Sequence, residues 1–462
     1  MSTGHQASLA DAFERALGAI QARVSAFAHG IAVAYSGGLD SSALLHLASA
    51  YARAHGLPLY AFHIHHGLSA NADAWQSHCE HACAGLGVRF DARRVTLTDS
   101  RRDGTEQAAR ICRYAALGDL CRAHGVSLLL TAHHLDDQAE TVLLRLLRGS
   151  GVAGLCGMEA ANIAPELLGD SELVIARPLL GISRAELERY VSEQGIAYVD
   201  DESNADTRFA RNALRHDIMP SLSRHFPGFQ GRIARSARHM GASQQVLDEV
   251  AALDLDACSD GDGIDLVRLK RLSDPRIDNL LRYWLSRRGV RMPSTAWLAQ
   301  MREQLMVARE DARVRVIHAD GEIHRHRGRI FLAPRISDAT LAVPPAAFRW
   351  GGEGRIHFPQ FGGALHFCDA DEGIDAEWLA AQDMQIRLRG GGEVLKLASN
   401  RPTRSLKHHY QALNIPAWER LQLPVVLAAN RLVFAAGIGM NWGGVPIARE
   451  KAVSLSWKKD PT

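Results

Sequence analysis

The chain has 462 residues, too many for one ordinary domain, so we expect two or three domains. Hydrophobic residues make up 47% of the chain and charged residues 23%, and no apolar run is long enough to cross a bilayer. This composition is typical of a soluble globular protein and excludes a membrane-spanning one. The N-terminus lacks the basic start and apolar core of a signal peptide, and seven scattered cysteines favour reduced thiols in a cytoplasmic protein.

The net charge of +2 hides an uneven distribution of charge along the chain. Residues 1–200 carry 16 basic and 21 acidic side chains, whereas the remainder carries 37 basic and 30 acidic ones. Two runs stand out: Thr207–Met240 has seven arginines against one acid, and Arg387–Gln411 has six basic residues against one acid. Such runs are either solvated faces or surfaces that bind a polyanion by releasing its counterions, and charge alone leaves both interpretations open.

Short apolar runs alternate with helical patterns over the first part of the chain. The predicted strands are Ile31–Tyr35, Leu59–His63, Val88–Val95, Ser127–Thr131 and Leu173–Ala176, and the predicted helices lie near Ser42–Arg53, Ala74–Leu86, Glu106–His124 and Asp137–Leu147. Repeated β-α-β units predict an α/β fold, a doubly wound parallel sheet covered by helices on both faces. A capping box at Ser183–Glu186 opens one more helix, which Gly195 can end.

The pattern changes near Pro220. The expected elements are a long helix over 229–255, mixed helix up to 309, a hairpin with Asp320-Gly321 as its turn, a linker at 343–345, and a strand-rich end with a helix near 405–413. We therefore divide the chain into a first domain at residues 1–218, a mainly helical middle domain at 219–345 and an α+β C-terminal domain at 346–462.

The first motif, SGGLDSS, lies between the first predicted strand and the first helix. The order strand, glycine loop, helix is typical of phosphate sites, because glycines let backbone amides and the helix N-terminus approach an anion. It is not a Walker motif, since no lysine occurs before Lys270. Asp40 would repel phosphate unless a cation lies between them, which implies Mg²⁺. The plain alternative is a glycine turn with a helix cap. The predicted phosphate ligands are Ser36, Gly37, Gly38, Leu39, Asp40, Ser41 and Ser42.

The second motif, TAHHLDDQAETVLLRLLRGSGVAGLCGM, follows another predicted strand. His133 and His134 stand at the strand end, where doubly wound sheets bind their ligands. Asp137 and Glu140 are three residues apart and share one face of the next helix. Acids in a first helical turn also complement the helix dipole, and the spacing of a zinc site is lacking. The combination favours a cluster in which His134, Asp137 and Glu140 hold magnesium and an amine.

Arginines supply the third feature. Arg110 and Arg113 in GTEQAARICRY lie at helical spacing, which is typical of surface ion pairs but also suits the neutralisation of a phosphoryl group. The stretch VDDESNADTRFARNALRHDIMP is either a charged connector that leaves the first domain or a contact surface for RNA or an adenylate. After its acids, it places cationic side chains at Arg208, Arg211, Arg215 and His216.

SGGLDSS resembles the pyrophosphate-binding loop of the N-type ATP pyrophosphatases, enzymes that cleave ATP between its α and β phosphates. Together with HIHHGLS, GTEQAARICRY, TAHHLDDQAET, RPLL and DDESNADTRFARNALR, it makes most of residues 28–220 similar to the tRNA(Ile)-lysidine synthetase family. The segments RLRGGGEVLKL and RSLKHHYQALNIPAWERLQLPVV also resemble that family's final domain. The middle of the chain, about 240–350, resembles the family only in length and placement.

The resemblance implies a PP-loop ATPase domain, adenine nucleotide alpha hydrolase-like, that binds ATP and Mg²⁺ and acts on an isoleucine tRNA with a CAU anticodon. The C2 oxygen of the wobble cytidine would attack the α phosphate and release pyrophosphate. Free lysine would then displace AMP to give lysidine, which decodes AUA instead of AUG. The implied catalytic residues are Asp40, His134, Asp137, Glu140 and Arg211. Mg²⁺ would be held by Asp40, Asp137 and Glu140, and charge at the α phosphate would be neutralised by Arg110, Arg113 and Arg211.

The nearest rival is another enzyme of the same superfamily, such as a tRNA thiolase. Thiolases of this type usually carry a C-x-x-C pair, which this sequence lacks. A GMP or NAD synthetase would not need the basic carboxyl-terminal half, and a nucleotide-binding regulatory module would leave the histidine–acid cluster unexplained. The sequence indicates no membrane association and no protein partner, and it leaves a homodimer open.

Overall fold

This computed structural model describes residues 8–22, 30–65, 67, 71–95, 105–200, 210–309, 314–335 and 342–460. The chain forms two compact units, residues 1–247 and 248–462. The long predicted helix is present as α11 (Phe229–Cys258), which begins in the first unit and ends in the second.

The first unit is built on a sheet to which the described residues contribute six strands, in the order β3-β2-β1-β4-β6-β5. Neighbouring strands are parallel except β5 and β6. In register, Ile31 of β1 lies opposite Leu59 of β2 on one side and Leu128 of β4 on the other. The strand order therefore reverses between β1 and β4, as in doubly wound folds. The strands are β1 (Ile31–Ala34), β2 (Leu59–His65), β3 (Arg89–Arg94), β4 (Leu128–Leu130), β5 (Ala161–Ile163) and β6 (Val174–Ala176).

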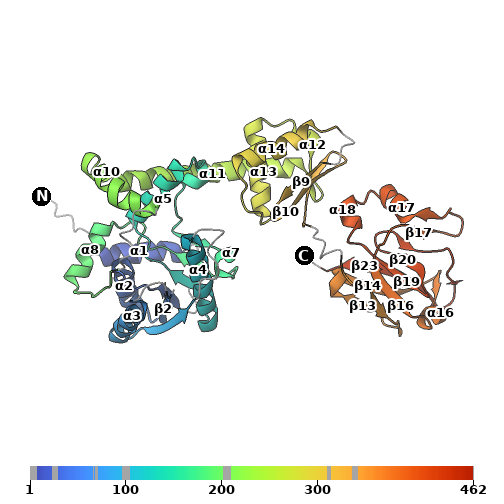
Figure 1. Cartoon of the computed structure of the whole chain (residues 1–462), viewed down its shortest axis with the longest axis horizontal. Coiled ribbons are helices and arrows are strands. Elements are labelled where there is room, and N and C mark those ends of the chain that lie inside the picture. The colour runs from blue at the N-terminus through green and yellow to red at the C-terminus, as the bar shows by residue number, and fades with distance from the viewer. Residues whose placement is uncertain are drawn as a thin grey trace. The chain divides into compact units, whose positions relative to one another are not determined.

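Alternation of side chains along the strands builds a core on each face of the sheet. Ile31 and Val33 enter one core, and Ala32 between them enters the other. In Figure 1 the strands lie between α2 and α3 on one side and α4 on the other, so the predicted doubly wound α/β fold is confirmed. The first core is completed by α1 (Leu9–Gln21), α2 (Leu39–His55), α3 (Ala72–Leu86) and α8 (Arg184–Glu193), and the second by α4 (Thr105–His124) and α7 (Pro165–Leu168).

Every strand and helix predicted for this region occurs, with ends shifted by a few residues. The capping box of α8 is present, because the Ser183 hydroxyl accepts the amide proton of Glu186 and the Glu186 carboxylate accepts that of Ser183. Gly195 follows this helix with φ +60°, as expected. The helix α1 was not predicted, although its 13 residues and the capping box at Ser8 were a usable signal. The antiparallel edge strand β5 and the one-turn helices α6 (Val152–Leu155) and α7 were also not predicted, since three or four residues give too little periodicity.

The carboxyl ends of β1 and β4 meet at the point where the strand order reverses. The loop after β1 leads into α2, and the loop after β4 leads into α5 (Leu135–Leu147). A small core joins Ala139 of α5 to Leu214, Met219 and Phe229. These three belong to the π-helical turn η2 (Leu214–Ile218), α10 (Met219–His225) and α11, and α9 (Ala210–Ala213) directly precedes η2. This core therefore brings α9 and η2 to the surface of α5.

The second unit begins with a segment in which the predicted helices are accompanied by an antiparallel sheet. Within the described residues, this sheet has the order β7-β8-β11-β10-β9. The helices are α12 (Leu266–Leu269), α13 (Asp274–Arg287) and α14 (Thr295–Val307), and the strands are β7 (Ser259–Asp260), β8 (Gly263–Asp265), β9 (Arg315–His318), β10 (Gly321–His326) and β11 (Arg329–Ala333).

The predicted hairpin is present, but its turn lies one residue earlier than Asp320-Gly321. Gly321 already pairs with His318, so Ala319 and Asp320 form the turn. Gly321 is needed for close packing instead, since a Cβ there would lie 3.1 Å from the Ala333 carbonyl oxygen.

The chain ends in an α+β fold with two five-stranded sheets and a two-stranded ribbon among the described residues. The predicted helix near 405–413 is α17 (Leu406–Ala412), and 343–345 form no regular structure. None of the described helices has the length and apolar character needed to cross a bilayer. The sheets are β12 (Ala346–Phe348), β16 (Met384–Leu388), β19 (Pro424–Ala428), β20 (Arg431–Ala435) and β21 (Gly439–Met440), then β13 (Arg355–Phe358), β14 (Gly363–Ala370), β23 (Ala452–Lys459), β15 (Gly373–Asp375) and β22 (Ile447–Ala448). The ribbon is β17 (Val394–Leu395) and β18 (Arg404–Ser405), and the remaining helices are η3 (Pro359–Phe361), α16 (Ala376–Ala380) and α18 (Ala417–Arg420).

Candidate active site

The glycine loop after β1 has the backbone geometry of an anion site. Gly37 has φ +86°, and a Cβ at this position would lie 2.9 Å from the Cys79 sulfur and 3.1 Å from a Val199 methyl group. Only glycine fits here without strain. The Gly38 N-cap supplies no side-chain bond, and the amides of a first helical turn have no intrahelical acceptor. The N-terminus of α2 can therefore donate several backbone amides to one anion.

The hydroxyl groups of this loop make internal hydrogen bonds. The Ser41 hydroxyl donates to the Gly38 carbonyl oxygen at 3.0 Å, and the Ser42 hydroxyl donates to the Gly37 carbonyl oxygen at 3.2 Å. Both side chains are buried, whereas Ser36 is exposed and lies 3.0 Å from the Ser41 hydroxyl. In this conformation the serine hydroxyls hold the loop in shape, since the Ser36 amide also donates to the Ser41 hydroxyl at 3.3 Å and the Gly38 amide to the Ser36 hydroxyl at 3.4 Å.

Asp40 connects the loop to the second motif. Its Oδ2 lies 3.6 Å from Nε2 of His134 and 3.5 Å from Nη1 of Arg184. Its Oδ1 is buried and accepts no hydrogen bond from the residues that the structure describes. Because a buried carboxylate oxygen without a partner is unfavourable, this atom is a candidate ligand for a cation.

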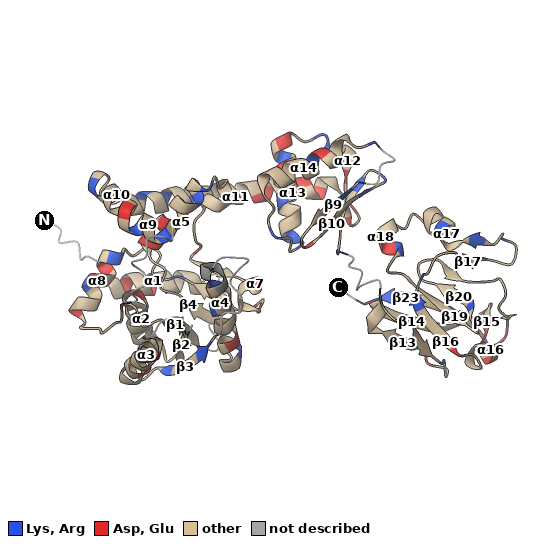
Figure 2. Cartoon of the chain, viewed as in Figure 1, with Lys and Arg blue, Asp and Glu red and all other residues tan. Residues whose placement is uncertain are grey.

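The second motif forms a buried carboxylate pair that two arginines cover. Glu140 is 1% exposed and Asp137 is 8% exposed, and both side chains project from α5. Arg211 donates from Nε to Glu140 at 2.8 Å and from Nη2 to Asp137 at 2.9 Å. Arg215 donates from Nε to Glu140 at 2.7 Å and from Nη2 to Asp137 at 3.1 Å. In Figure 2 acidic and basic positions lie side by side where α5 and α9 meet.

His134 lies at the centre of this group and is 1% exposed. It is the N-cap of α5, and its Nε2 lies 3.4 Å from Oδ2 of Asp137. Burial alone lowers the pKa of His134, but the nearby Asp40, Asp137 and Asp136 carboxylates outweigh burial and raise that pKa above its ordinary value. Burial raises the pKa of Asp137, but the charges of His134 and Arg211 outweigh it and leave that pKa below its usual range.

His133 has the opposite electrostatic environment. Burial, helped by the charges of Arg177, Arg211 and Arg110, lowers its pKa to about 3 against the opposing effect of Asp137. Its imidazole is therefore neutral at physiological pH, and Nδ1 lies 2.9 Å from the Thr131 hydroxyl. The two adjacent histidines thus have different protonation behaviour, which their sequence positions do not distinguish.

The predicted phosphate arginines Arg110 and Arg113 both lie against one buried tyrosine. Their guanidinium carbons are 4.8 Å and 5.6 Å from the centroid of the Tyr114 ring. A guanidinium group over an aromatic face is attracted by the ring, which restricts the arginine side chain. Because Arg110 also acts electrostatically on His133, its charge reaches the second motif.

Sequence reasoning did not assign Arg215 or Arg184 to the site. Arg215 had a usable signal, since its i, i+4 spacing from Arg211 places both side chains on one helical face. Asp136 belongs to the second motif but has a structural role. Its carboxylate accepts from the Arg184 amide at 2.9 Å and from the Gln230 side chain at 3.1 Å, so it ties α5 to α8 and α11. Arg208 lies outside the described residues.

The three predicted Mg²⁺ ligands differ in how free they are. No group of three or more histidine, cysteine, aspartate and glutamate side chains with metal-binding geometry occurs among the described residues. Asp40 has a spare oxygen, whereas Asp137 and Glu140 accept hydrogen bonds from guanidinium groups. Asp40 therefore fits a metal ligand as it stands, and the other two carboxylates fit only if the arginines move.

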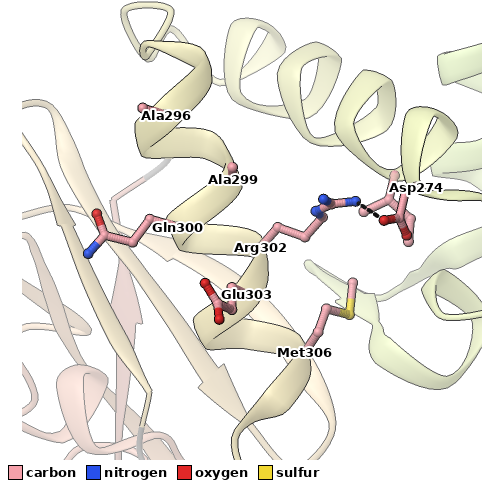
Figure 3. Close-up of a pocket in the computed structure, with 8 residues that line it drawn as sticks. Asp274, Ala296, Ala299, Gln300, Arg302, Glu303 and Met306 are labelled. Carbon is pink, nitrogen blue, oxygen red and sulfur yellow. Dashed lines mark ion pairs between the residues drawn. The ribbon is translucent and has the colours of Figure 1, made fainter.

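A separate cavity of about 550 Å³ lies between α13 and α14 in the second unit (Figure 3). Its one arginine, Arg302, contacts Asp274 at 2.9 Å and Asp278 at 3.3 Å. The cationic group is thus engaged by its own neighbours, and the cavity contains none of the predicted site residues.

Three protein families match this chain in succession. Residues 9–222 match the family described as PP-loop domain, residues 264–331 match the TilS substrate binding domain, and residues 384–457 match the TilS substrate C-terminal domain. The first match contains both motifs of the candidate site. The second covers the middle part of the chain, for which the sequence motifs carried no resemblance.

Relatives match over nearly the full length. The chain is 41% identical over 442 residues to the tRNA(Ile)-lysidine synthase of Burkholderia pseudomallei, with 89% of each chain covered. It is 40% identical over 446 residues to the tRNA(Ile)-lysidine synthase of Pseudomonas aeruginosa, with 93% of each covered. A U34-tRNA thiolase structure from Methanococcus maripaludis is 17% identical with a TM-score of 0.42 and covers 50% of this chain and 77% of its own. A likeness that low gives no support to a thiolase function.

Proposed function

The chain belongs to the tRNA(Ile)-lysidine synthase family, and from that premise we propose how its side chains share the reaction. The reaction joins free lysine to the C2 carbon of the wobble cytidine in an isoleucine tRNA with a CAU anticodon, and it converts ATP to AMP and pyrophosphate. It needs one site for a triphosphate and an adjacent site for a primary amine. The observation that carries the proposal is the buried carboxylate pair Asp137 and Glu140, which His134 links to Asp40 in the phosphate loop.

The triphosphate is held by the amides at the N-terminus of α2 and by Ser36. Leu39 is 8% exposed and its side chain packs in the hydrophobic core, so only its backbone amide would bind the phosphate. Asp40 would hold Mg²⁺ through its partnerless oxygen, and the bound ion would neutralise charge on the phosphates. Arg110 and Arg113 add positive charge toward the α phosphate, where charge develops as the cytidine oxygen attacks. The loop differs from a Walker site because it contains no lysine, so all of its own hydrogen-bond donors to phosphate are uncharged.

The lysine amine is held by Asp137 and Glu140. A free lysine ε-amine has a pKa of about 10.4, so it arrives as an ammonium ion and needs anionic acceptors. Two buried carboxylates provide them, and their burial strengthens each charge-assisted hydrogen bond. Both carboxylates accept hydrogen bonds from guanidinium groups, which supports their use as acceptors for a cation with N–H donors.

Before the amine attacks C2, it must lose a proton, because an ammonium ion has no lone pair. We assign the proton acceptor to His134, because its imidazole lies between the Asp40 and Asp137 carboxylates, which stabilise a positive charge there and raise the pKa of His134 above its ordinary value. Its Nε2 faces Asp137 and Asp40 and has no hydrogen-bond partner among the described residues. The imidazole can therefore take the proton beside the carboxylates that hold the amine.

The later parts of the chain recognise the tRNA. The basic run at 387–411 includes most of α17, where Figure 2 shows basic residues on the ribbon, and it lies within the part that matches the C-terminal family. Clustered cationic side chains of this kind bind a phosphate backbone by releasing counterions. We place the enzyme in the cytoplasm, where its tRNA, ATP and lysine occur, and the homodimer stays a prediction.

The test is an incorporation assay with ATP, radiolabelled lysine and total tRNA. We expect the label in one isoleucine tRNA with a CAU anticodon, together with equal amounts of AMP and pyrophosphate. Asp137→Asn keeps the size of the side chain but removes its charge, so it should abolish incorporation at low lysine concentration. ADP and orthophosphate as products, or label in a different tRNA, would contradict the proposed function.

A further inference from the structure

The carboxylate pair is occupied by its own chain. Five hydrogen bonds of 2.7–3.1 Å join Asp137 and Glu140 to Arg211 and Arg215. Asp137 Oδ1 and both Glu140 oxygens are acceptors in these bonds, and they are the atoms that a lysine ammonium group would need. These four side chains comprise two anions and two guanidinium cations, and lysine would bring a third cation to the carboxylate pair.

A third cation in this buried group is electrostatically unfavourable unless one guanidinium leaves. Arg211 and Arg215 are 32% and 28% exposed, whereas the carboxylates beneath them are far more buried, so the arginines are the groups with room to move. A guanidinium group can bind two oxygens of a phosphate with two parallel hydrogen bonds, just as it binds the two oxygens of a carboxylate. The phosphates of ATP or of the tRNA thus offer the arginines an alternative partner.

The chain also connects these arginines to the phosphate loop. The amide of Val199 donates to the Gly37 carbonyl oxygen at 2.9 Å, and Arg211 follows twelve residues later. Arg215 lies in the π-helical turn η2, a geometry that is rare and often found at functional positions. A residue that contacts the phosphate loop therefore shortly precedes, in the sequence, the element that carries the arginines.

We propose that Arg215 is an internal competitor of lysine, a guanidinium group that fills the amine site until substrate phosphates draw it away. This inference rests on the proposed function, because it takes Asp137 and Glu140 as the lysine site. It gives Arg215 a role in ordering the substrates: lysine binds productively only after the nucleotide or the tRNA. The apparent affinity for lysine equals the intrinsic affinity multiplied by the fraction of molecules in which Arg215 has left the amine site.

The test measures equilibrium binding of radiolabelled L-lysine to the full-length protein without tRNA. Arg215→Ala should bind lysine about tenfold more tightly than the parent protein, since loss of a charge-assisted bond is worth about one order of magnitude in a binding constant. A non-hydrolysable ATP analogue with Mg²⁺ should tighten lysine binding to the parent protein but change Arg215→Ala by less than twofold. Arg189→Ala removes an exposed arginine of α8 and should leave lysine binding unchanged.

Folding of each variant is checked by circular dichroism and thermal denaturation. If Arg215→Ala does not fold, Arg215→Lys keeps the charge without the bidentate geometry and should give a smaller gain in lysine affinity. Unchanged or weaker lysine binding by the folded variant would overturn the inference. Glu140→Gln separates this failure from that of the proposed function: if it abolishes lysine binding, the lysine site stands and only the competitor role is wrong. If Glu140→Gln binds lysine normally, the lysine site and the competitor role both fail.

Discussion

Replacing Glu140 by glutamine removes one charge from the amine site with almost no change in volume. Glu140 is 1% exposed and accepts three hydrogen bonds from Arg211 and Arg215, at 2.7–3.0 Å. A hydrogen bond to a charged group contributes about 1.5–3 kcal/mol, and each 1.4 kcal/mol is a factor of ten in a binding constant. If lysine takes these acceptors, Glu140→Gln should raise the KM for lysine about 10- to 150-fold.

The same substitution should lower the free energy of unfolding of the first unit by about 2 kcal/mol. Breaking a buried ion pair costs about 3–5 kcal/mol, but Arg211 and Arg215 are partly exposed and keep Asp137 as a partner, which reduces the loss. A protein with stability typical of its size stays folded after this loss, so the kinetic effect can be measured.

The assay is lysine incorporation into tRNA at saturating ATP, with lysine concentration varied. ATP–pyrophosphate exchange in the presence of tRNA but without lysine serves as the control reaction, because it reports adenylation alone. Retained exchange assigns Glu140 to lysine, whereas lost exchange assigns it to Mg²⁺ as well. Glu193→Gln, at an exposed position at the end of α8, should change neither reaction. A lysine KM within twofold of that of the parent protein would refute the reasoning.

Three further predictions concern other parts of the enzyme. Asp40→Asn should abolish ATP–pyrophosphate exchange, because the amide is a poor Mg²⁺ ligand; exchange at the parent rate would remove Asp40 from the metal site. The raised pKa of His134 means that its stabilising effect is fully present below the unfolded pKa of about 6.5 and is lost as pH rises through the folded pKa. The unfolding temperature should therefore fall above neutral pH, and His134→Gln should remove that part of the slope; an identical slope would contradict it. In the C-terminal run, the triple variant Arg401→Ala, Arg404→Ala and Lys407→Ala removes three positive charges. It should weaken tRNA binding and reduce the slope of the logarithm of the binding constant against the logarithm of salt concentration by about three at most. An unchanged slope would show that these side chains only face water.

The positions of both site loops could be predicted from the sequence, but the burial and the hydrogen-bond partners of their individual side chains could not. The serines of the phosphate loop illustrate this limit. Ser36, Ser41 and Ser42 are equivalent hydroxyls in the sequence, yet two of them are buried and bond to loop carbonyls while Ser36 is exposed. Burial depends on the helices that pack around the loop, and local spacing carries no information about it. Asp136 is a similar case, since its partners lie on α8 and α11.

What the sequence by itself determined is the framework: alternating apolar strands and amphipathic helices, and two polar motifs that each follow a strand. In a parallel sheet the carboxyl ends of the strands share one edge, so SGGLDSS and HHLDDQAET were expected at the same edge, whereas the pairing of β1 with β4 that makes them neighbours is tertiary. Only the tertiary structure decided which cations the carboxylates bind. Arg211 and Arg215 lie 71–78 residues from Asp137 and Glu140, and a small apolar core on α5 brings them together. Contacts over such separations depend on how whole elements pack, which no short stretch of sequence encodes.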